Sequence, residues 1–212
     1  MGMPADIVHL VRHGEVHNPK RVLYGRLEGF GLSELGHRMA ASAVAALAGY
    51  PVTALTSSPL QRTRESAAPW ADAFGLEAHI DERLIEPTNR FEGKRMDKRT
   101  LMNPRYWHLA RDPSLPSWGE PFALIAARML DAMTDAHHSV DGGEVVMVSH
   151  QLPIWMVHRA VAGERFAHDP RHRRCSLSSV TSFALQDGAF TEIGYQDPAA
   201  DLLAASTDLG AV

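Results

Sequence analysis

The sequence predicts an α/β fold, a three-layer α/β/α sandwich in which helices cover both faces of a mostly parallel sheet. Apolar, β-branched runs at residues 7–11 and 145–148 have the length and composition of buried strands, and polar residues follow each of them. Between these runs, segments with helical spacing of apolar residues alternate with further short strand-like runs. Such alternation is typical of parallel sheets, because parallel neighbours need crossover helices.

Composition predicts one domain over residues 1–212. The chain has 212 residues, 45% of them hydrophobic, which is enough to bury a sizeable core. A formal net charge of -4 gives no overall positive charge to attract nucleic acid or an anionic membrane. The single cysteine, Cys175, cannot form an internal disulfide, and the first residues lack a secretory signal. We therefore expect a cytoplasmic protein without nucleic-acid or membrane partners.

The first strand-like run ends in Arg12-His13-Gly14. Ligands of open α/β sheets bind at the carboxyl ends of the strands. Arg12 offers a planar guanidinium fork, and His13 offers an imidazole that can act as a nucleophile. Gly14 allows a sharp turn or a close backbone approach. This combination suits a phosphoryl group.

Capping signals predict the helices that follow. Ser33 is a suitable N-cap for one helix, and Ser58 for a second helix with Pro59 as its first residue. Arg62 would lie about one turn into the second helix, where it could reach an anion held at the helix N-terminus. Arg64 fits a solvated helix surface better, although spacing alone does not separate the two arginines.

Residues 78–80 predict a third strand, and Glu86 follows it at the start of a long irregular region. The segment 88–121 has an excess of basic residues and is interpreted as a lid over the sheet edge, with a solvated surface loop nearly as good an explanation. Helical spacing after Gly119 predicts a helix. The residues expected to turn its apolar face to the core are Leu124, Leu130, Met133 and Ala136.

The strand-like run at 145–148 ends in Ser149-His150-Gln151, so a second histidine leaves a strand end as His13 does. Residues 178–185 and 190–195 predict a hairpin that closes or edges the sheet. The remaining residues, 197–212, are expected to form a loose C-terminal tail.

These segments, in chain order, resemble the histidine phosphatase superfamily, which includes the cofactor-dependent phosphoglycerate mutases and many small phosphatases. The matching residues are Arg12-His13-Gly14-Glu15, Leu32-Ser33 with Gly36 and Ala40, Ser57-Ser58-Pro59-Leu60 with Arg62, Ser66 and Ala67, Leu84-Ile85-Glu86, Gly119-Glu120 with Arg128, and Ser149-His150. They span most of residues 7 to 155. No further motif is matched in the lid or after about residue 163.

The resemblance implies catalytic roles for five residues. His13 takes the phosphoryl group. Arg12, Arg62 and His150 clamp the phosphoryl oxygens, and Glu86 donates the proton. A transferring phosphoryl group needs this kind of positioning and positive charge more than covalent help. His13 must attack through a neutral nitrogen and donate a hydrogen bond from the other, whereas His150 beside a dianion should be held protonated.

Asn18 and Gln151 are further candidates for phosphate or substrate contacts. The chain departs from the family pattern at both, since many members place Asn one residue further along and Gly after the second histidine. Mutases also carry Arg-His-Tyr-Gly after the catalytic glutamate, where this chain has Pro87-Thr88-Asn89-Arg90. Residues 98–100 only faintly resemble the paired arginines that grip phosphoglycerate.

The resemblance therefore implies a phosphatase that hydrolyses a small phosphomonoester through a phosphohistidine intermediate. Two alternatives stay open: a cofactor-dependent phosphoglycerate mutase, which would need 2,3-bisphosphoglycerate, and a non-catalytic module that only binds a phosphorylated ligand. The intact set of catalytic residues argues against the second. We expect no metal, because the histidines lack ligand spacing, and no cofactor. A homodimer is compatible with the sequence.

Overall fold

The computed structural model describes residues 4–95, 102, 104 and 119–208. Within them, six strands form one sheet in the order β3-β2-β4-β1-β5-β6. The strands are β1 (Ile7–Arg12), β2 (Val52–Ser57), β3 (Ala78–Ile80), β4 (Glu144–Ser149), β5 (Val180–Gln186) and β6 (Ala189–Gln196). The first four run parallel, and β5 pairs antiparallel with both β1 and β6. The predicted mostly parallel sheet, with a hairpin at one edge, is confirmed.

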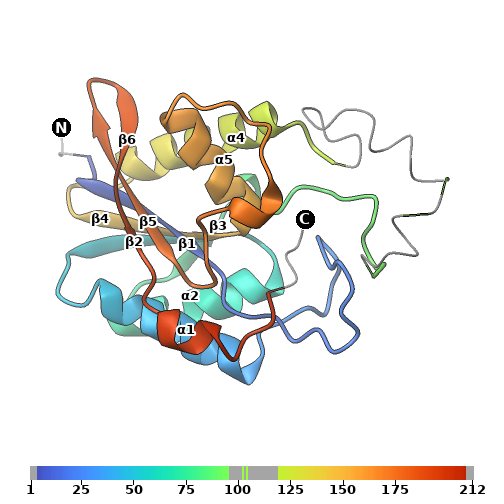
Figure 1. The fold of residues 1–212 in the computed structure, drawn as a ribbon. Helices are drawn as coiled ribbons and strands as arrows, with labels where there is room; N and C mark the ends of the chain where they lie inside the picture. Colours follow the sequence, from blue (N-terminus) through green and yellow to red (C-terminus); the bar gives the residue numbers. More distant parts are fainter. Residues whose placement is uncertain (1–3, 96–101, 103, 105–118, 209–212) are drawn as a thin grey trace.

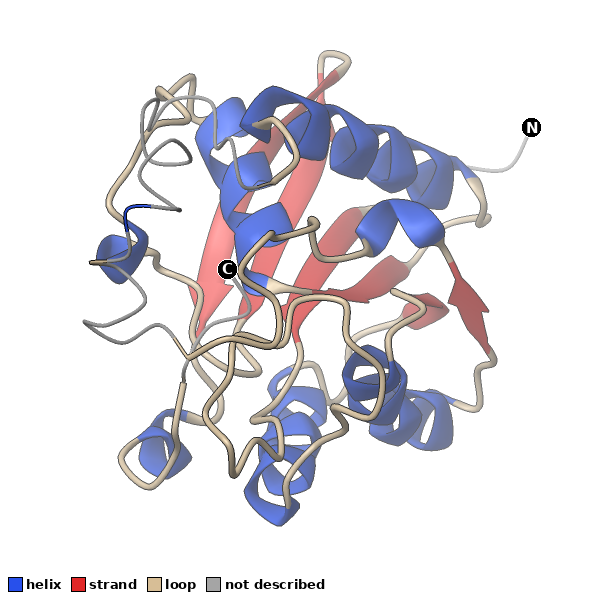
Figure 2. Cartoon of the chain, turned by 90° about the vertical axis from the view of Figure 1, so that its right-hand side faces the viewer, coloured by secondary structure: helices blue, strands red, loops and turns tan. Residues whose placement is uncertain are grey.

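Helices cover both faces of this sheet, as Figures 1 and 2 show. The helices are α1 (Glu34–Ala46), α2 (Gln61–Phe74), α4 (Phe122–His138), α5 (Gln151–Val161) and the short α6 (Ala200–Leu203), with single 3-10 turns η1 (Glu82–Leu84) and η3 (Pro170–His172). One apolar core joins α1 and α2 to the sheet, and another joins α4 and α5 to its opposite face. The three-layer sandwich is confirmed. No helix in the described part of the chain is long and apolar enough to cross a membrane.

The register of the parallel strands brings distant parts of the chain to one edge. Arg12 pairs with Ser149 across β1 and β4, and Ser57 pairs with Val148 across β2 and β4. The strands therefore end level with one another, because parallel partners run in the same direction. The residues that follow them leave the sheet side by side.

The local signals at the helix starts were right for α1 and wrong for α2. Ser33 caps α1, and its hydroxyl oxygen accepts a hydrogen bond from the Gly36 N–H at 3.0 Å. Helix α2 begins at Gln61 with Leu60 as N-cap, so Arg62 lies in its first turn. Ser58 lies two residues before that N-cap, and its hydroxyl bonds a histidine instead.

The expectation of a loose C-terminal tail is wrong for residues 197–208. Ala199 is buried, and the α6 residues Leu202 and Leu203 pack in one cluster with Met39 and Leu177. Figure 1 shows α6, drawn in red, beside α1. A helix of four residues is too short to produce a periodic pattern, so the sequence carries no signal for it.

Most of the basic lid lies outside the described residues, including Lys98, Arg99, Arg105 and Arg111. Its two flanks meet, because Asn89 and Gly119 form an antiparallel bridge. The segment 88–121 therefore leaves and returns at neighbouring points, and its role as a lid stays a prediction.

The predicted apolar face of α4 is correct except at one residue. Met133 is fully buried, while Leu130 and Ala136 pack against the core cluster from partly buried positions. Leu124 is 58% exposed, because it lies on the side of the helix opposite to Phe122 and Ile125, which are buried against α5. Met129, which the expected face omitted, is 0% exposed in the centre of that core.

This helix provides a matched test of the packing. Met129→Ala should lower the free energy of unfolding by about 2–5 kcal/mol, because it leaves a cavity in a closed core. Leu124→Ala, on the same helix, should change it by no more than about 0.5 kcal/mol. Urea denaturation followed by circular dichroism measures both, and similar losses for the two variants would contradict the assigned orientation of α4.

Candidate active site

His13 is placed by the end of β1 and is 1% exposed. Its Nδ1 donates a hydrogen bond to the Gly14 carbonyl oxygen at 2.7 Å, which leaves Nε2 with the lone pair. Burial, reinforced by the charges of Arg62 and Arg12, holds the pKa of His13 well below its usual value. The imidazole is therefore neutral and oriented by its backbone bond, as a nucleophile requires.

Gly14 is required by a close backbone approach. A Cβ atom at this position would lie 2.4 Å from the carbonyl oxygen of Gly36, in the first turn of α1. The Gly14 N–H donates to the Ser66 hydroxyl of α2 at 3.1 Å. The glycine thus lets α1 and α2 pack directly on the loop that carries His13.

His150 follows β4 and is the N-cap residue of α5. Its ring lies edge-on to that of His13, with centroids 5.2 Å apart. Its Nε2 is 2.8 Å from the Ser58 hydroxyl, a contact that the sequence does not indicate because the Ser58-Pro59 pattern is typical of a helix cap. Burial, together with the charge of Arg62, holds the pKa of His150 well below its usual value. The protonated form expected from the sequence therefore requires the negative charge of a bound dianion.

Arg62 extends from the first turn of α2 into the same buried region. Its Nη2 donates to the Gly25 carbonyl oxygen at 2.8 Å, and its guanidinium lies 4.9 Å from the centroid of the Tyr24 ring. Burial lowers its pKa from the ordinary value. Tyr24 lies in a loop without any pattern, so no sequence signal identified it. Arg64, by contrast, is exposed, as expected of a solvated helix residue.

Arg12 is 1% exposed and paired with a carboxylate that the sequence did not indicate. Its Nη2 and Nη1 donate to the two carboxylate oxygens of Asp208 at 2.7 and 2.8 Å, and Nη1 also donates to the Cys175 carbonyl oxygen at 2.7 Å. Burial opposes the charge of Arg12, but the Asp208 carboxylate outweighs it and raises the pKa of Arg12. Arg12 therefore stays protonated and positively charged although it is buried.

Glu86 is fully enclosed just after η1. Burial raises the pKa of Glu86 to about 7, although the nearby Arg62 acts in the opposite direction. Its Oε2 lies 3.6 Å from Nδ1 of His150. A carboxyl group with this pKa is protonated in about half of the molecules at neutral pH and can both give and take a proton, as a general acid must.

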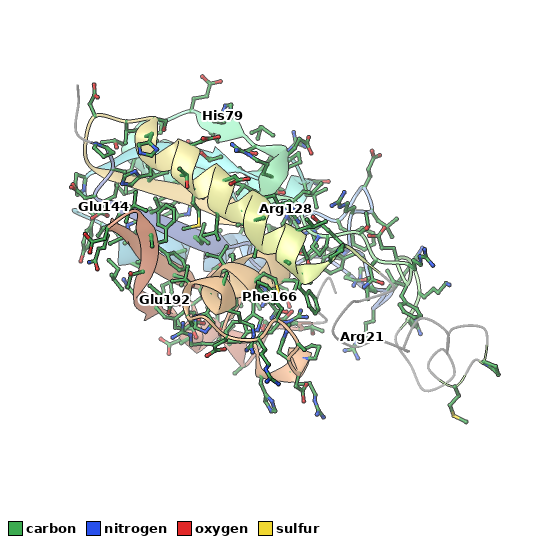
Figure 3. The ribbon with its side chains drawn as sticks, turned by 90° about the horizontal axis from the view of Figure 1, so that it is seen from above. Arg21, His79, Arg128, Glu144, Phe166 and Glu192 are labelled. Atoms are coloured by element: carbon green, nitrogen blue, oxygen red, sulfur yellow. The ribbon has the colours of Figure 1, made fainter. Side chains whose placement is uncertain are left out.

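The backbone around Glu86 is held by neighbouring side chains. The Glu86 carbonyl oxygen accepts from Arg26 Nε at 2.5 Å, and the Leu84 carbonyl oxygen accepts from the Ser149 hydroxyl at 2.7 Å. Arg128, labelled on α4 in Figure 3, donates to the Arg83 carbonyl oxygen and pairs with Glu120 at 2.9 Å. The Arg128 of the family motif therefore supports the acid-bearing loop from α4.

Buried polar atoms without a hydrogen-bond partner gather at these residues. Of the ten such side-chain atoms in the described part of the chain, five belong to the site: Nε of Arg12, Nε of Arg62, Nδ1 of His150 and both carboxyl oxygens of Glu86. Buried polar groups are rarely left unpaired, and those that are often mark a site completed by a ligand. Two guanidinium donors, an imidazole and an acid suit an anion with several oxygens.

Asn18 and Gln151 lie at two cavities beside this centre. Asn18 uses its side chain in a local turn, donating to the Val22 carbonyl oxygen at 2.7 Å, and it lines a cavity of about 340 Å³. Gln151, the first residue of α5, accepts from Arg173 Nη1 at 3.3 Å and lines a cavity of about 540 Å³. Asp208 lines both cavities. The structure thus brings the five predicted catalytic residues together and places Asn18 and Gln151 at their margins.

Comparison with known proteins agrees with this geometry. The family model for the histidine phosphatase superfamily (branch 1) matches residues 8–198. Uncharacterized protein Rv0525 of Mycobacterium tuberculosis is 48% identical over 201 residues, covering 93% of this chain and 100% of that protein. Probable phosphoglycerate mutase GpmB of Yersinia pestis is 31% identical over 185 residues, covering 82% of this chain and 83% of that protein.

A solved structure shows the same fold. Phosphoserine phosphatase from Entamoeba histolytica, in complex with 3-phosphoglyceric acid, superposes with a TM-score of 0.74 at 19% identity, covering 96% of this chain and 98% of that chain. At this identity the likeness concerns the fold alone. The family match over residues 8–198, together with the relatives, shows that the chain belongs to the histidine phosphatase superfamily.

Proposed function

We propose that this protein is a phosphatase that hydrolyses a small phosphomonoester through a phosphohistidine on His13. The observation that carries the proposal is one buried site in which the ring of His13 lies 5.2 Å from that of His150, centroid to centroid, and Glu86 lies 3.6 Å from His150; there His13 is held neutral, and the pKa of Glu86 is raised to about 7. Groups whose environments push their pKa values apart mark the nucleophile and the acid.

In the first half-reaction, Nε2 of His13 attacks phosphorus as the bond to the leaving oxygen breaks. The charges of Arg12 and Arg62 stabilise the phosphoryl oxygens in the transition state. Glu86 gives its proton to the leaving oxygen, so an alcohol departs rather than an alkoxide. His150, protonated in the field of the dianion, adds a third donor.

In the second half-reaction, water attacks the phosphohistidine. The ionised Glu86 takes a proton from that water, the P–N bond breaks, and inorganic phosphate leaves with His13 neutral again. The carboxyl group therefore regains the proton that it gave to the leaving group. No metal or cofactor is needed in this scheme.

The residues after Glu86 favour hydrolysis over a mutase reaction. A mutase keeps water from the phosphoenzyme and holds the substrate carboxylate with dedicated arginines. Here Arg90 is exposed, and the side chain of the buried Asn89 is used locally, accepting from the Phe91 N–H at 2.9 Å. Pro87 also imposes a different local backbone from the mutase pattern. The partner we propose is thus a small anionic phosphate ester.

The covalent step is tested by trapping. Mixing the protein with p-nitrophenyl phosphate and quenching in alkali should yield an acid-labile, alkali-stable phosphoprotein detectable by mass spectrometry, because phosphohistidine survives base. His13→Ala should lose both this species and phosphate release. Near-normal turnover by His13→Ala would refute the scheme.

The same preparation separates hydrolysis from mutase activity. With 3-phosphoglycerate, phosphate release should exceed formation of 2-phosphoglycerate whether or not 2,3-bisphosphoglycerate is added. Fast, bisphosphoglycerate-dependent formation of 2-phosphoglycerate with little phosphate release would replace the phosphatase assignment by the mutase one. Binding without either reaction would support the non-catalytic module.

The phosphate clamp is tested on α2. Arg62→Ala should lower kcat/KM by a factor on the order of a hundred or more, since it removes a preorganised charge next to the transferring group. Arg64→Ala, two residues away and exposed, should have little effect. Steady-state kinetics with one substrate compare them, and equal losses would mean that the clamp is misplaced.

The acid is tested with two leaving groups and a pH series. Glu86→Gln should lower kcat/KM for an alkyl phosphate severely and spare kcat/KM for p-nitrophenyl phosphate, whose leaving group hardly needs a proton, because kcat/KM reports the transfer to His13 and not the later attack of water. Because the folded-state pKa of Glu86 is raised to about 7, its proton is present below that pH and is lost above it. For the wild type, kcat/KM with the alkyl phosphate should therefore fall as pH rises through about 7.

Glu86→Gln should lose that alkaline limb. If kcat/KM of the variant falls equally with both leaving groups, Glu86 has a positioning role and the assignment as acid fails.

A further inference from the structure

Some of the N–H donors of the Arg12 guanidinium are hydrogen-bonded within the described part of the chain, and others are not. It has five N–H donors in a rigid plane. Nη1 uses both of its donors, on the Cys175 carbonyl oxygen and on Asp208, and Nη2 uses one on Asp208. Nε has no partner among the described residues although it is buried. The donors left over, on Nε and Nη2, lie side by side and form a second fork that matches two phosphate oxygens.

Asp208 is brought to Arg12 by contacts along the C-terminal segment. The Thr207 N–H donates to Glu15 Oε1 at 2.6 Å, and the other carboxylate oxygen of Glu15 accepts from the Ser33 hydroxyl. Upstream, Leu202 and Leu203 pack with Met39 of α1. Glu15 lies two residues after His13, so the loop that carries the nucleophile also holds the segment that carries Asp208.

Arg12 and Asp208 differ in how far their side chains are exposed to solvent. The Arg12 side chain is 1% exposed, whereas that of Asp208 is 36% exposed. A buried guanidinium without a counter-charge is unfavourable, and removing one partner of such a pair leaves the other uncompensated. Without Asp208, only the Cys175 carbonyl would hold Nη1, and the plane of the guanidinium would be free to turn.

We propose that Asp208 is a positioning residue for phosphate binding, which holds one end of Arg12 so that the Nε and Nη2 edge faces the phosphoryl group. The identity of the reaction rests on the proposed function, but the positioning concerns only anion binding. The proposal adds a residue from the C-terminal segment, where the family motifs do not reach, to the clamp around His13.

Three proteins test this: the wild type, Asp208→Ala, and Asp201→Ala as a control. Asp201 is an exposed carboxylate in the same segment, on α6, so its loss changes the net charge equally. Affinity for inorganic phosphate is measured by calorimetry, and kcat/KM with p-nitrophenyl phosphate by steady-state kinetics. Asp208→Ala should weaken both by a factor of about ten to a hundred, as misplacement of a binding group does. Asp201→Ala should match the wild type.

A double-mutant cycle shows whether Asp208 acts through Arg12. In an Arg12→Ala background, Asp208→Ala should change phosphate affinity by less than about twofold, because the group that it orients is gone. An equal loss in both backgrounds would mean a general structural role and would overturn the proposal. Tighter phosphate binding by Asp208→Ala would overturn it too, by showing that the carboxylate competes with phosphate.

The calorimetric measurement separates this proposal from the proposed function. Phosphate binding that depends on Asp208, in a protein that hydrolyses no phosphomonoester, would leave the positioning role intact and remove the phosphatase assignment. Unchanged hydrolysis and phosphate affinity in Asp208→Ala would leave the phosphatase assignment intact and remove the positioning role.

Discussion

The parallel pairing of β1 with β4 is the interaction on which the rest of the site depends. Its register sets Arg12 opposite Ser149, so His13 and His150 leave the sheet together and their rings come within 5.2 Å, centroid to centroid. Pairing of β2 with β4 adds Ser58 and the start of α2 with Arg62. A shift of this register would separate groups that lie more than a hundred residues apart in sequence.

Burial gives these groups their chemistry. Desolvation favours the neutral form of any ionisable group, so the same enclosure lowers the pKa of His13 and raises that of Glu86. The charges of Arg12 and Arg62 lower the pKa of His13 further and limit the rise in the pKa of Glu86. The arrangement leaves several polar atoms unpaired, which is the condition under which an arriving anion gains the most from each hydrogen bond.

The C-terminal segment is part of this electrostatic arrangement. Asp208 compensates the charge of the deeply buried Arg12, while Glu15 holds the backbone next to Asp208. Helix α6, which packs on α1, immediately precedes the residues that bring Asp208 to Arg12. Asp208 lines both cavities beside the site, and Thr207 and Ser206 each line one of them, so the segment contributes to the walls of both.

The sequence by itself determined the succession of strands and helices along the chain and the mostly parallel sheet, because periodicity is a local signal. Its resemblance to a family predicted Arg12, His13, Arg62, Glu86 and His150 as site residues, and these five residues lie together in the structure. The sequence placed Ser58, Leu124 and the C-terminal segment incorrectly and carried no sign of Tyr24 or Asp208. Only the tertiary structure decided these, since each depends on contacts between residues far apart in the chain. The Asp208 carboxylate meets Arg12 across 196 positions, and a single exposed aspartate near a chain end has no pattern that could reveal such a partner.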